Sequence, residues 1–170
     1  VQFRIAHTDD AILVHYKVKE ASVRAVAAGD NGAVWEDACV EFFSIPAGDG
    51  IYYNVECNCA GTLLIGAGAG RENREHAPQE VMDKVQRWSS LGRQSFEERV
   101  GECNWELALV IPYSAFFKHQ ITSLDGKTVR ANFYKCGDKL QTPHFLSWNP
   151  IALEKPNFHC PEFFGTLNFE

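Results

Sequence analysis

The sequence predicts an all-β fold, an antiparallel β-sandwich or jelly roll with little helix. Short segments that alternate apolar and polar residues follow one another along the chain, separated by Gly, Asp and Pro turn signals. No long segment repeats apolar residues at the 3.6-residue period of a helix. With 170 residues and 45% hydrophobic content the chain suffices for one core, so we expect a single domain over residues 1–170.

The first strands are predicted at the N-terminal end. Residues 3–20 alternate on both sides of a turn at residues 8–10, which is typical of a hairpin. Residues 22–28 suit a further short strand, and residues 29–32 (GDNG) suit a turn. The sequence opens in this strand-like pattern without an initiator Met, which leaves open whether another strand precedes Val1.

Residues 34–61 are predicted to form the central hairpin, with a loop at residues 47–50 that places Glu41 opposite Glu56. Side chains alternate along a strand, so the hairpin has two unlike faces. An apolar face, expected to contact the core, carries Val40, Phe42, Ile51, Tyr53, Val55, Cys57 and Cys59. The opposite face, expected to contact water or a ligand, carries Glu41, Phe43, Tyr52, Asn54, Glu56 and Asn58.

The glycine-rich segment after the hairpin must be compared with a nucleotide-binding loop. Residues 61–70 contain GxGxG, but a dinucleotide-binding loop must open a helix, and here a polar segment with Pro78 follows. We therefore interpret this segment as a strand running into a loop.

The later elements are predicted from the same alternation. Residues 81–99 are polar, residues 103–112 form a strand with Trp105 in the core, and residues 113–120 suit one helical turn. Strands at residues 129–136 and 165–169 flank a proline-containing loop.

Charge, hydrophobicity and cysteine content exclude several classes of partner and site. The net charge of −6 without a dense Lys/Arg run argues against nucleic acid as a partner. No apolar run approaches the length of about 20 residues that spans a bilayer, so no membrane partner is expected. Six cysteines in a chain with a core favour buried free thiols over a disulfide framework, and they do not have zinc-site spacing.

The predicted pairing of Glu41 with Glu56 needs an explanation, because two facing carboxylates repel each other. Three interpretations remain open. Arginine or lysine side chains could bind the pair as a polar platform beneath a ligand. Ca²⁺ could bind there with oxygen ligands such as Asp37 and Asp49. Alternatively, the pair could be a glycosidase dyad.

Several segments together resemble carbohydrate-binding module family 9 and its DOMON-like relatives, which are antiparallel sandwiches attached to xylanases. They are WEDACVEFF, IYYNVECNCAG, WELALVIP, ANFYKCGD, LSWNP and FFGTLNF, and they extend over nearly the whole chain. In this family two tryptophans enclose a sugar ring at the end of a glycan, while a carboxylate, an arginine and amides bind its hydroxyls. Matched residue by residue, the resemblance implies a binding site of Trp35, Glu41, Arg71, Asn132, Trp148 and Asn149, with Arg74 as an alternative to Arg71 and Lys135 as a looser candidate.

The resemblance implies non-catalytic binding of plant-type glucan or xylan oligosaccharides through a two-tryptophan clamp. It implies no certain cofactor, although a structural Ca²⁺ is common in the family. The family works outside the cytoplasm, whereas unpaired cysteines favour a reducing interior. Two other functions remain: a small glycoside hydrolase that uses Glu41 and Glu56, and a module that docks to proteins.

Overall fold

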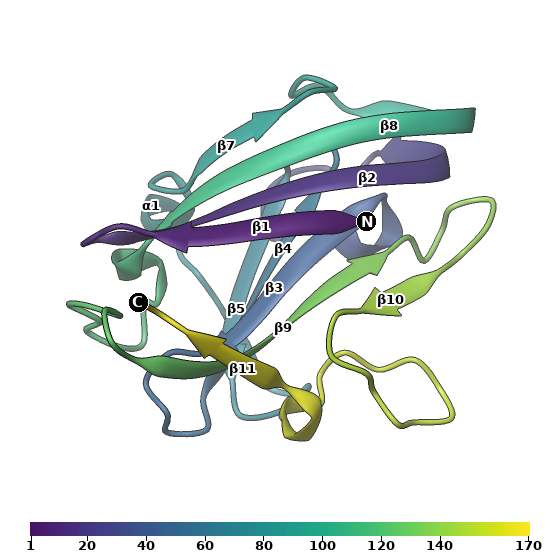
Figure 1. Cartoon of the computed structure of the whole chain (residues 1–170). Helices are drawn as coiled ribbons and strands as arrows, with labels where there is room; N and C mark the ends of the chain where they lie inside the picture. The colour runs from purple at the N-terminus through teal and green to yellow at the C-terminus, as the bar shows by residue number, and fades with distance from the viewer.

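The computed structural model describes all 170 residues and contains two antiparallel β-sheets packed face to face (Figure 1). The smaller sheet has four strands in the order β1-β2-β8-β7. Their bounds are Gln2–His7 for β1, Ala11–Ala25 for β2, Gln86–Ser89 for β7 and Phe96–Pro112 for β8. The all-β sandwich that the alternating pattern predicts is therefore confirmed.

The larger, seven-stranded sheet has the order β10-β9-β3-β4-β5-β6, and β11 also pairs with β9. Its strands are β3 (Cys39–Ile45), β4 (Tyr52–Asn58), β5 (Leu63–Gly68), β6 (Glu75–His76), β9 (Thr128–Cys136), β10 (Phe145–Ser147) and β11 (Gly165–Asn168). Glu41 on β3 lies opposite Glu56 on β4, so the predicted register is confirmed. The Gly-rich strand β5 runs antiparallel to β4 and not in a βαβ unit.

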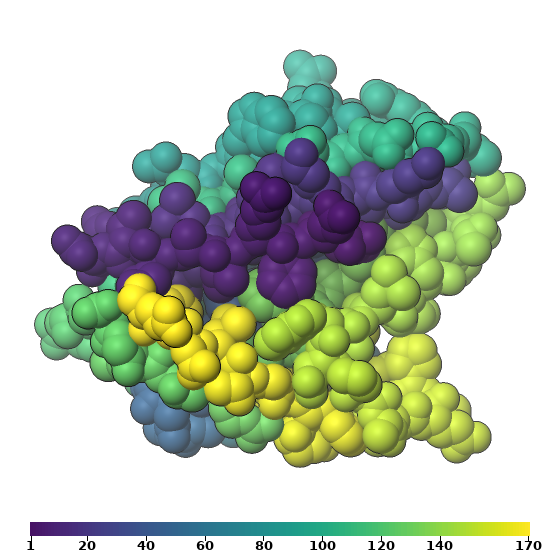
Figure 2. Space-filling model, viewed as in Figure 1, coloured from purple at the N-terminus to yellow at the C-terminus, as the bar shows by residue number.

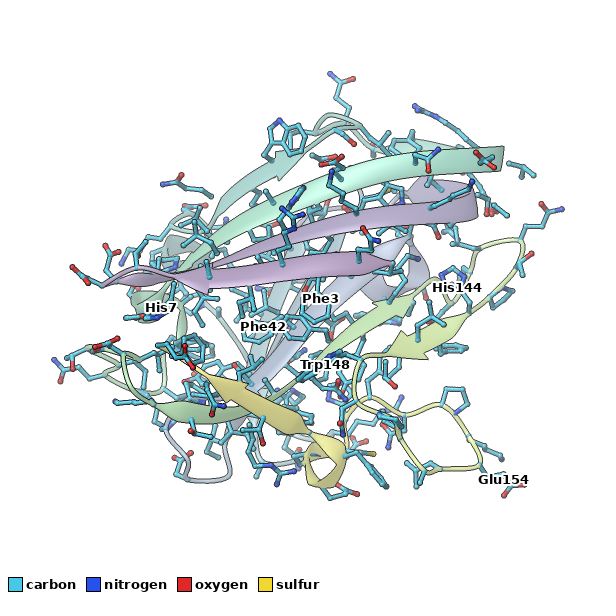
Figure 3. All side chains as sticks on the ribbon, viewed as in Figure 1. Phe3, His7, Phe42, His144, Trp148 and Glu154 are labelled. Atoms are coloured by element: carbon cyan, nitrogen blue, oxygen red, sulfur yellow. The ribbon has the colours of Figure 1, made fainter.

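The core lies between the two sheets. Six residues of the predicted apolar face of the β3–β4 hairpin belong to its buried cluster, and Ile51 packs against that cluster. Trp105 is 2% exposed in the same cluster, as predicted. Figure 3 shows Phe3 from β1 and Phe42 from β3 in the space between the sheets. Period-two alternation thus divides the hairpin into a core face and an outer face.

Several elements differ from the predicted ones, and β6, β7 and β10 lie in segments for which no strand is predicted. β2 continues to Ala25 in place of a separate strand at residues 22–28, because its pairing with β8 resumes after each of two irregularities in the register. β8 begins at Phe96, so the last residues of the polar segment 81–99 belong to this strand and pair with the end of β2. A short helix, α1 (Gln79–Met82), follows Pro78, whose extended backbone suits the position before a helix.

The other helical pieces are single 3₁₀ turns: η1 (Val34–Glu36), η2 (Tyr113–Ala115) and η3 (Pro161–Phe163). The predicted helical turn within residues 113–120 corresponds to η2. No helix is long and apolar enough to cross a membrane.

Residues 148–164 form a loop that leaves and returns to the same edge of the larger sheet. β10 and β11 both pair with β9, with Ser147 opposite Tyr134 and Gly165 opposite Ala131. Figure 2 shows the yellow-green C-terminal segments protruding at the side of the molecule below the N-terminal strands. Residues of the loop pack on the outer face of the sheet in a second, smaller cluster with Phe43, Tyr52 and Tyr134. The loop therefore covers part of the face that the sequence leaves available to water or a ligand.

Candidate functional site

A cavity of about 360 Å³ lies on the outer face of the larger sheet, between the sheet and the loop 148–164. The size is in the range of small-molecule sites. Its lining combines aromatic rings with carboxyl, amide, guanidinium and imidazole groups: Trp35, Glu41, Asn54, Glu56, Leu64, Arg71, Arg74, His76, Cys136, Asp138, Phe145, Pro156, Asn157, Phe158 and His159. Three of these, Glu41, Asn54 and Glu56, belong to the hairpin face predicted to contact water or a ligand.

Two carboxyl groups lie on the floor of the cavity. Glu41 and Glu56 are 2% and 4% exposed. Burial raises the pKa of Glu56 to about 7, and burial together with the nearby Cys136 and Glu56 raises the pKa of Glu41 well above its usual range. The Cys136 thiol donates to Glu41 Oε1 at 3.0 Å. A protonated Glu41 can both donate and accept a hydrogen bond, which suits a hydroxyl-bearing ligand.

A chain of polar contacts holds Glu56 in place. Arg74 donates to Asn54 Oδ1 through Nη2 at 2.6 Å, and Asn54 Nδ2 donates to Glu56 Oε1 at 2.8 Å. The Arg74 guanidinium also lies 3.9 Å from the centre of the Tyr52 ring. Gly66 lies opposite Asn54 on β5, and a Cβ there would come within 2.6 Å of Asn54 Oδ1. The absence of a side chain at Gly66 therefore gives Asn54 the room to reach Glu56.

The walls of the cavity carry exposed rings and a free cation. Trp35, on η1, is 39% exposed, and its carbonyl accepts a hydrogen bond from Asp138 N at 3.1 Å. Phe158, from the loop, stacks on Tyr134 with ring centres 4.2 Å apart. Arg71 is exposed at the cavity and makes no hydrogen bond or ion pair within the protein. Arg71 is thus free to contact a ligand, whereas Arg74 is occupied by the sheet.

The imidazole of His159 adds a neutral polar group. Its Nδ1 lies 2.8 Å from the Tyr52 hydroxyl. Burial, with the charges of Arg74 and Arg71, lowers the pKa of His159 to about 4. His159 is therefore neutral at physiological pH and offers a hydrogen-bonding group without a charge.

The structure does not bring Trp148 to this cavity. Pairing of Phe145 with Cys136 places Trp148 beside Phe133, which points to the core side of β9. The Trp148 ring contacts Phe133 and Phe3 edge to face, at centre distances of 5.8 and 6.1 Å. It lies at the open side of the space between the sheets, near Phe3, and is 45% exposed (Figure 3). Trp35 and Trp148 consequently lie on opposite faces of the larger sheet.

The two predicted amide residues lie at the base of the loop. Asn132 is fully buried; its Oδ1 accepts from Asn149 N at 2.8 Å and its Nδ2 donates to Asn149 O at 3.0 Å. Asn149 Nδ2 donates in turn to Phe163 O at 2.6 Å. The amide groups of Asn132 and Asn149 are thus hydrogen-bonded within the protein, and these bonds hold both ends of the loop that carries Phe158.

Lys135, the looser candidate, lies between the sheets. Its Nζ is 2.9 Å from Glu20 Oε2 and 2.7 Å from His144 Nε2. Lys135 is 2% exposed and does not line the cavity. Its charge is therefore compensated within the core rather than at the ligand side.

The oxygen ligands suggested for Ca²⁺ have other partners. Asp37 Oδ2 accepts from Val26 N, Ala27 N and Asn58 Nδ2, each at 3.0 Å. Asp49, at the hairpin loop, contacts His119 Nε2 at 2.8 Å. Neither lines the cavity with Glu41 and Glu56, so the two oxygen ligands suggested for Ca²⁺ do not form a site with this carboxyl pair.

Sequence reasoning missed the residues that the loops bring to the cavity: Asp138, Phe145, Asn157, Phe158 and His159. Apart from the strand residue Phe145, they lie in segments without periodicity. The one available signal is the run of ring-bearing and amide residues between Pro156 and Pro161, since prolines restrain a loop and aromatic side chains in loops are frequent in binding sites.

A two-sheet sandwich with a polar cavity bounded by aromatic rings suits a carbohydrate-binding module, a class of proteins that bind saccharides without cleaving them. The chain belongs to carbohydrate-binding family 9, whose model matches residues 1–169. No curated protein shows significant similarity to the chain.

The solved structures that are similar to the chain include two carbohydrate-binding proteins. One is a candidate carbohydrate-binding protein from Bacteroides uniformis, with 72% identity and a TM-score of 0.97 over 99% of this chain and 77% of that one. The other is a carbohydrate-binding module of family 9 from Caldicellulosiruptor kristjanssonii in complex with glucose. It has 11% identity and a TM-score of 0.59 over 99% of this chain and 75% of that one, which shows a shared fold alone.

Proposed function

We propose that the cavity binds the end of a glucan or xylan oligosaccharide, with one sugar ring against Trp35 and its hydroxyls directed to Glu41, Glu56 and Arg71. The observation that carries the proposal is the exposed Trp35 ring standing beside two buried carboxyl groups and an unpaired guanidinium. A pyranose has a face of C–H groups and a rim of hydroxyls, so it needs both a flat ring and fixed polar groups.

The second aromatic wall of the clamp is assigned to Phe158, supported by Phe145. The two rings contact each other edge to face at 6.2 Å, and Phe158 is held by its stack on Tyr134. Trp148, the partner that the resemblance implies, takes an indirect role in this proposal: it packs where the loop 148–164 begins. Asn132 and Asn149 likewise act through the loop and not on the sugar.

The size of the cavity supports a short ligand. About 360 Å³ holds one or two sugar rings, and the loop 148–164 bounds it on one side. Glucose in the related module from Caldicellulosiruptor kristjanssonii supports hexoses as the first ligands to test. Glucose, cellobiose, xylose and xylobiose therefore cover the two expected glycan classes.

The test is calorimetric titration of the protein with these four sugars while product formation is followed in the same samples. Trp35→Ala is expected to weaken binding about tenfold or more, about 1.4 kcal/mol, because it removes the stacking surface. Arg71→Ala is expected to weaken binding with unchanged thermal stability, because Arg71 has no partner within the protein.

Trp88→Ala is the matched control. Trp88 is 55% exposed on β7 in the other sheet, so its loss should leave sugar binding unchanged. Equal affinity of the Trp35→Ala variant and the unmodified protein, or no binding of any of the four sugars, would refute the proposed site. Turnover of an oligosaccharide would instead favour a glycosidase role for Glu41 and Glu56.

A further inference from the structure

Two thiols and a carboxyl group meet beneath the cavity. Cys39 on β3 lies directly opposite Cys136 on β9, and Glu41 follows Cys39 on the same face of β3. The Cys136 Sγ and Glu41 Oε1 atoms are 3.0 Å apart, and one ligand atom from each of the three residues lies within 4.8 Å of the others. Cys39 and Cys136 are 0% and 1% exposed.

We propose that Cys39, Glu41 and Cys136 form a binding site for a thiophilic divalent cation such as Zn²⁺. Two sulfur donors and one carboxylate are ligands that Zn²⁺ and Cd²⁺ prefer, and they exclude Ca²⁺ and Mg²⁺, which prefer oxygen donors alone. This site lies beyond the proposed saccharide function and does not depend on it.

The geometry suits a tetrahedral ion. Bonds of about 2.3 Å to sulfur and about 2.1 Å to oxygen place neighbouring ligand atoms about 3.5 to 3.8 Å apart around such an ion. The three ligand atoms are already within 4.8 Å of one another, so side-chain adjustments of about 1 Å are sufficient. The ligands come from neighbouring strands of one sheet, which hold them more rigidly than loops do.

The cavity supplies the route for the ion. Glu41 and Cys136 both line it, so a cation can reach the two from the solvent side. The cavity also carries Arg71 and Arg74 beside Glu56 and Asp138, so selection of the ion rests on the sulfur and carboxylate ligands themselves and not on the net charge of the cavity. With three protein ligands, a fourth position remains for water.

The other four cysteines do not form an equivalent group. Cys57 and Cys59 belong to the core between the sheets, two residues apart on the hairpin. Cys103 is partly exposed on β8, and Cys160 lies in the loop region before η3. All six cysteines are free, as predicted, so the chain itself offers matched thiol controls.

The experiment is a titration of the reduced, metal-free protein with Cd²⁺, followed by ultraviolet thiolate-to-metal charge-transfer absorption, with Zn²⁺ as competitor. We expect one equivalent to bind and Zn²⁺ to displace it. Cys39→Ala and Cys136→Ala should each weaken binding by more than about a hundredfold, the upper effect of losing a group that only supports a ligand, and reduce the absorption. Glu41→Gln should weaken binding while keeping the thiolate absorption. Cys103→Ala and Cys160→Ala should leave both unchanged.

Circular dichroism without metal identifies any variant that fails to fold, and Cys→Ser then replaces Cys→Ala at that position. A rise in melting temperature on Cd²⁺ addition, absent in the Cys39 and Cys136 variants, is the second readout. Unchanged Cd²⁺ affinity in both of these variants, or no charge-transfer absorption in the unmodified protein, would overturn the proposal.

Discussion

Replacement of Glu56 by Gln should remove much of the pH dependence of stability. Burial raises the pKa of Glu56 from 4.5 to about 7 in the folded protein. Between these values the folded protein retains a proton that the unfolded chain has lost, so the free energy of unfolding falls as the pH rises from about 4.5 to about 7, and this contribution is constant above that. One pKa unit corresponds to about 1.36 kcal/mol, which gives a total of at most about 3 kcal/mol.

The glutamine introduced in this variant cannot ionise, yet it keeps an oxygen that can accept the hydrogen bond from Asn54 Nδ2. At about pH 8 the Glu56→Gln variant should therefore be more stable than the unmodified protein by up to about 3 kcal/mol, and the two should converge below about pH 4.5. Glu41, whose pKa is also raised, accounts for a remaining slope. The assay is urea unfolding of the sugar-free protein across this pH range.

Glu154→Gln serves as the control, because Glu154 is exposed in the loop 148–164, as Figure 3 shows. It should leave the pH profile unchanged. If the Glu56→Gln variant retains the full slope between about pH 5 and about pH 7, the carboxyl group does not hold a proton in the folded state, and the assignment of the cavity floor is wrong.

Two further changes test the packing between the sheets. Phe133→Ala should lower the free energy of unfolding by about 3 to 5 kcal/mol, measured by urea denaturation, because the Phe133 ring is 3% exposed in the core; a loss below about 1 kcal/mol would contradict this. Lys135→Ala should cost about 3 to 5 kcal/mol in the same assay, since it removes the ammonium group beside the buried Glu20 carboxylate and leaves only the Trp105 indole N–H and His144 as partners. Lys139→Ala, which breaks the exposed pair with Glu36, is the control and should cost less than about 1 kcal/mol.

The alternation of apolar and polar residues predicts the strand register and the two faces of the β3–β4 hairpin. In the β3–β4 hairpin each residue has a neighbour of opposite character, and a shift of one residue would bury Glu41 with Val55, so the register follows from the pattern. The same pattern identifies Glu41, Asn54 and Glu56 as one face. Trp35 and Arg71 reach the cavity from segments that flank this hairpin or the neighbouring strand β5.

The sequence predicts less where the outcome depends on pairing between distant segments. Whether Trp148 points to the core or to the cavity is decided by the pairing of β10 with β9, and three residues of β10 are too few to show which face is apolar. The position of Phe158 depends on the stack with Tyr134, more than twenty residues earlier. No local periodicity carries that information.

The loop 148–164 is closed at its base like an Ω-loop, although slightly longer: both of its ends are fixed on one strand, β9, only a few residues apart. Its length can therefore change without altering the register of any strand, and doubling a loop costs only about 0.6 kcal/mol in closure entropy. Because Asn149 bridges the two ends, a transplanted loop that keeps this amide would be anchored in the same way. Ligand preference in this sandwich can thus diversify by exchange of one segment, while the two sheets and their core stay the same.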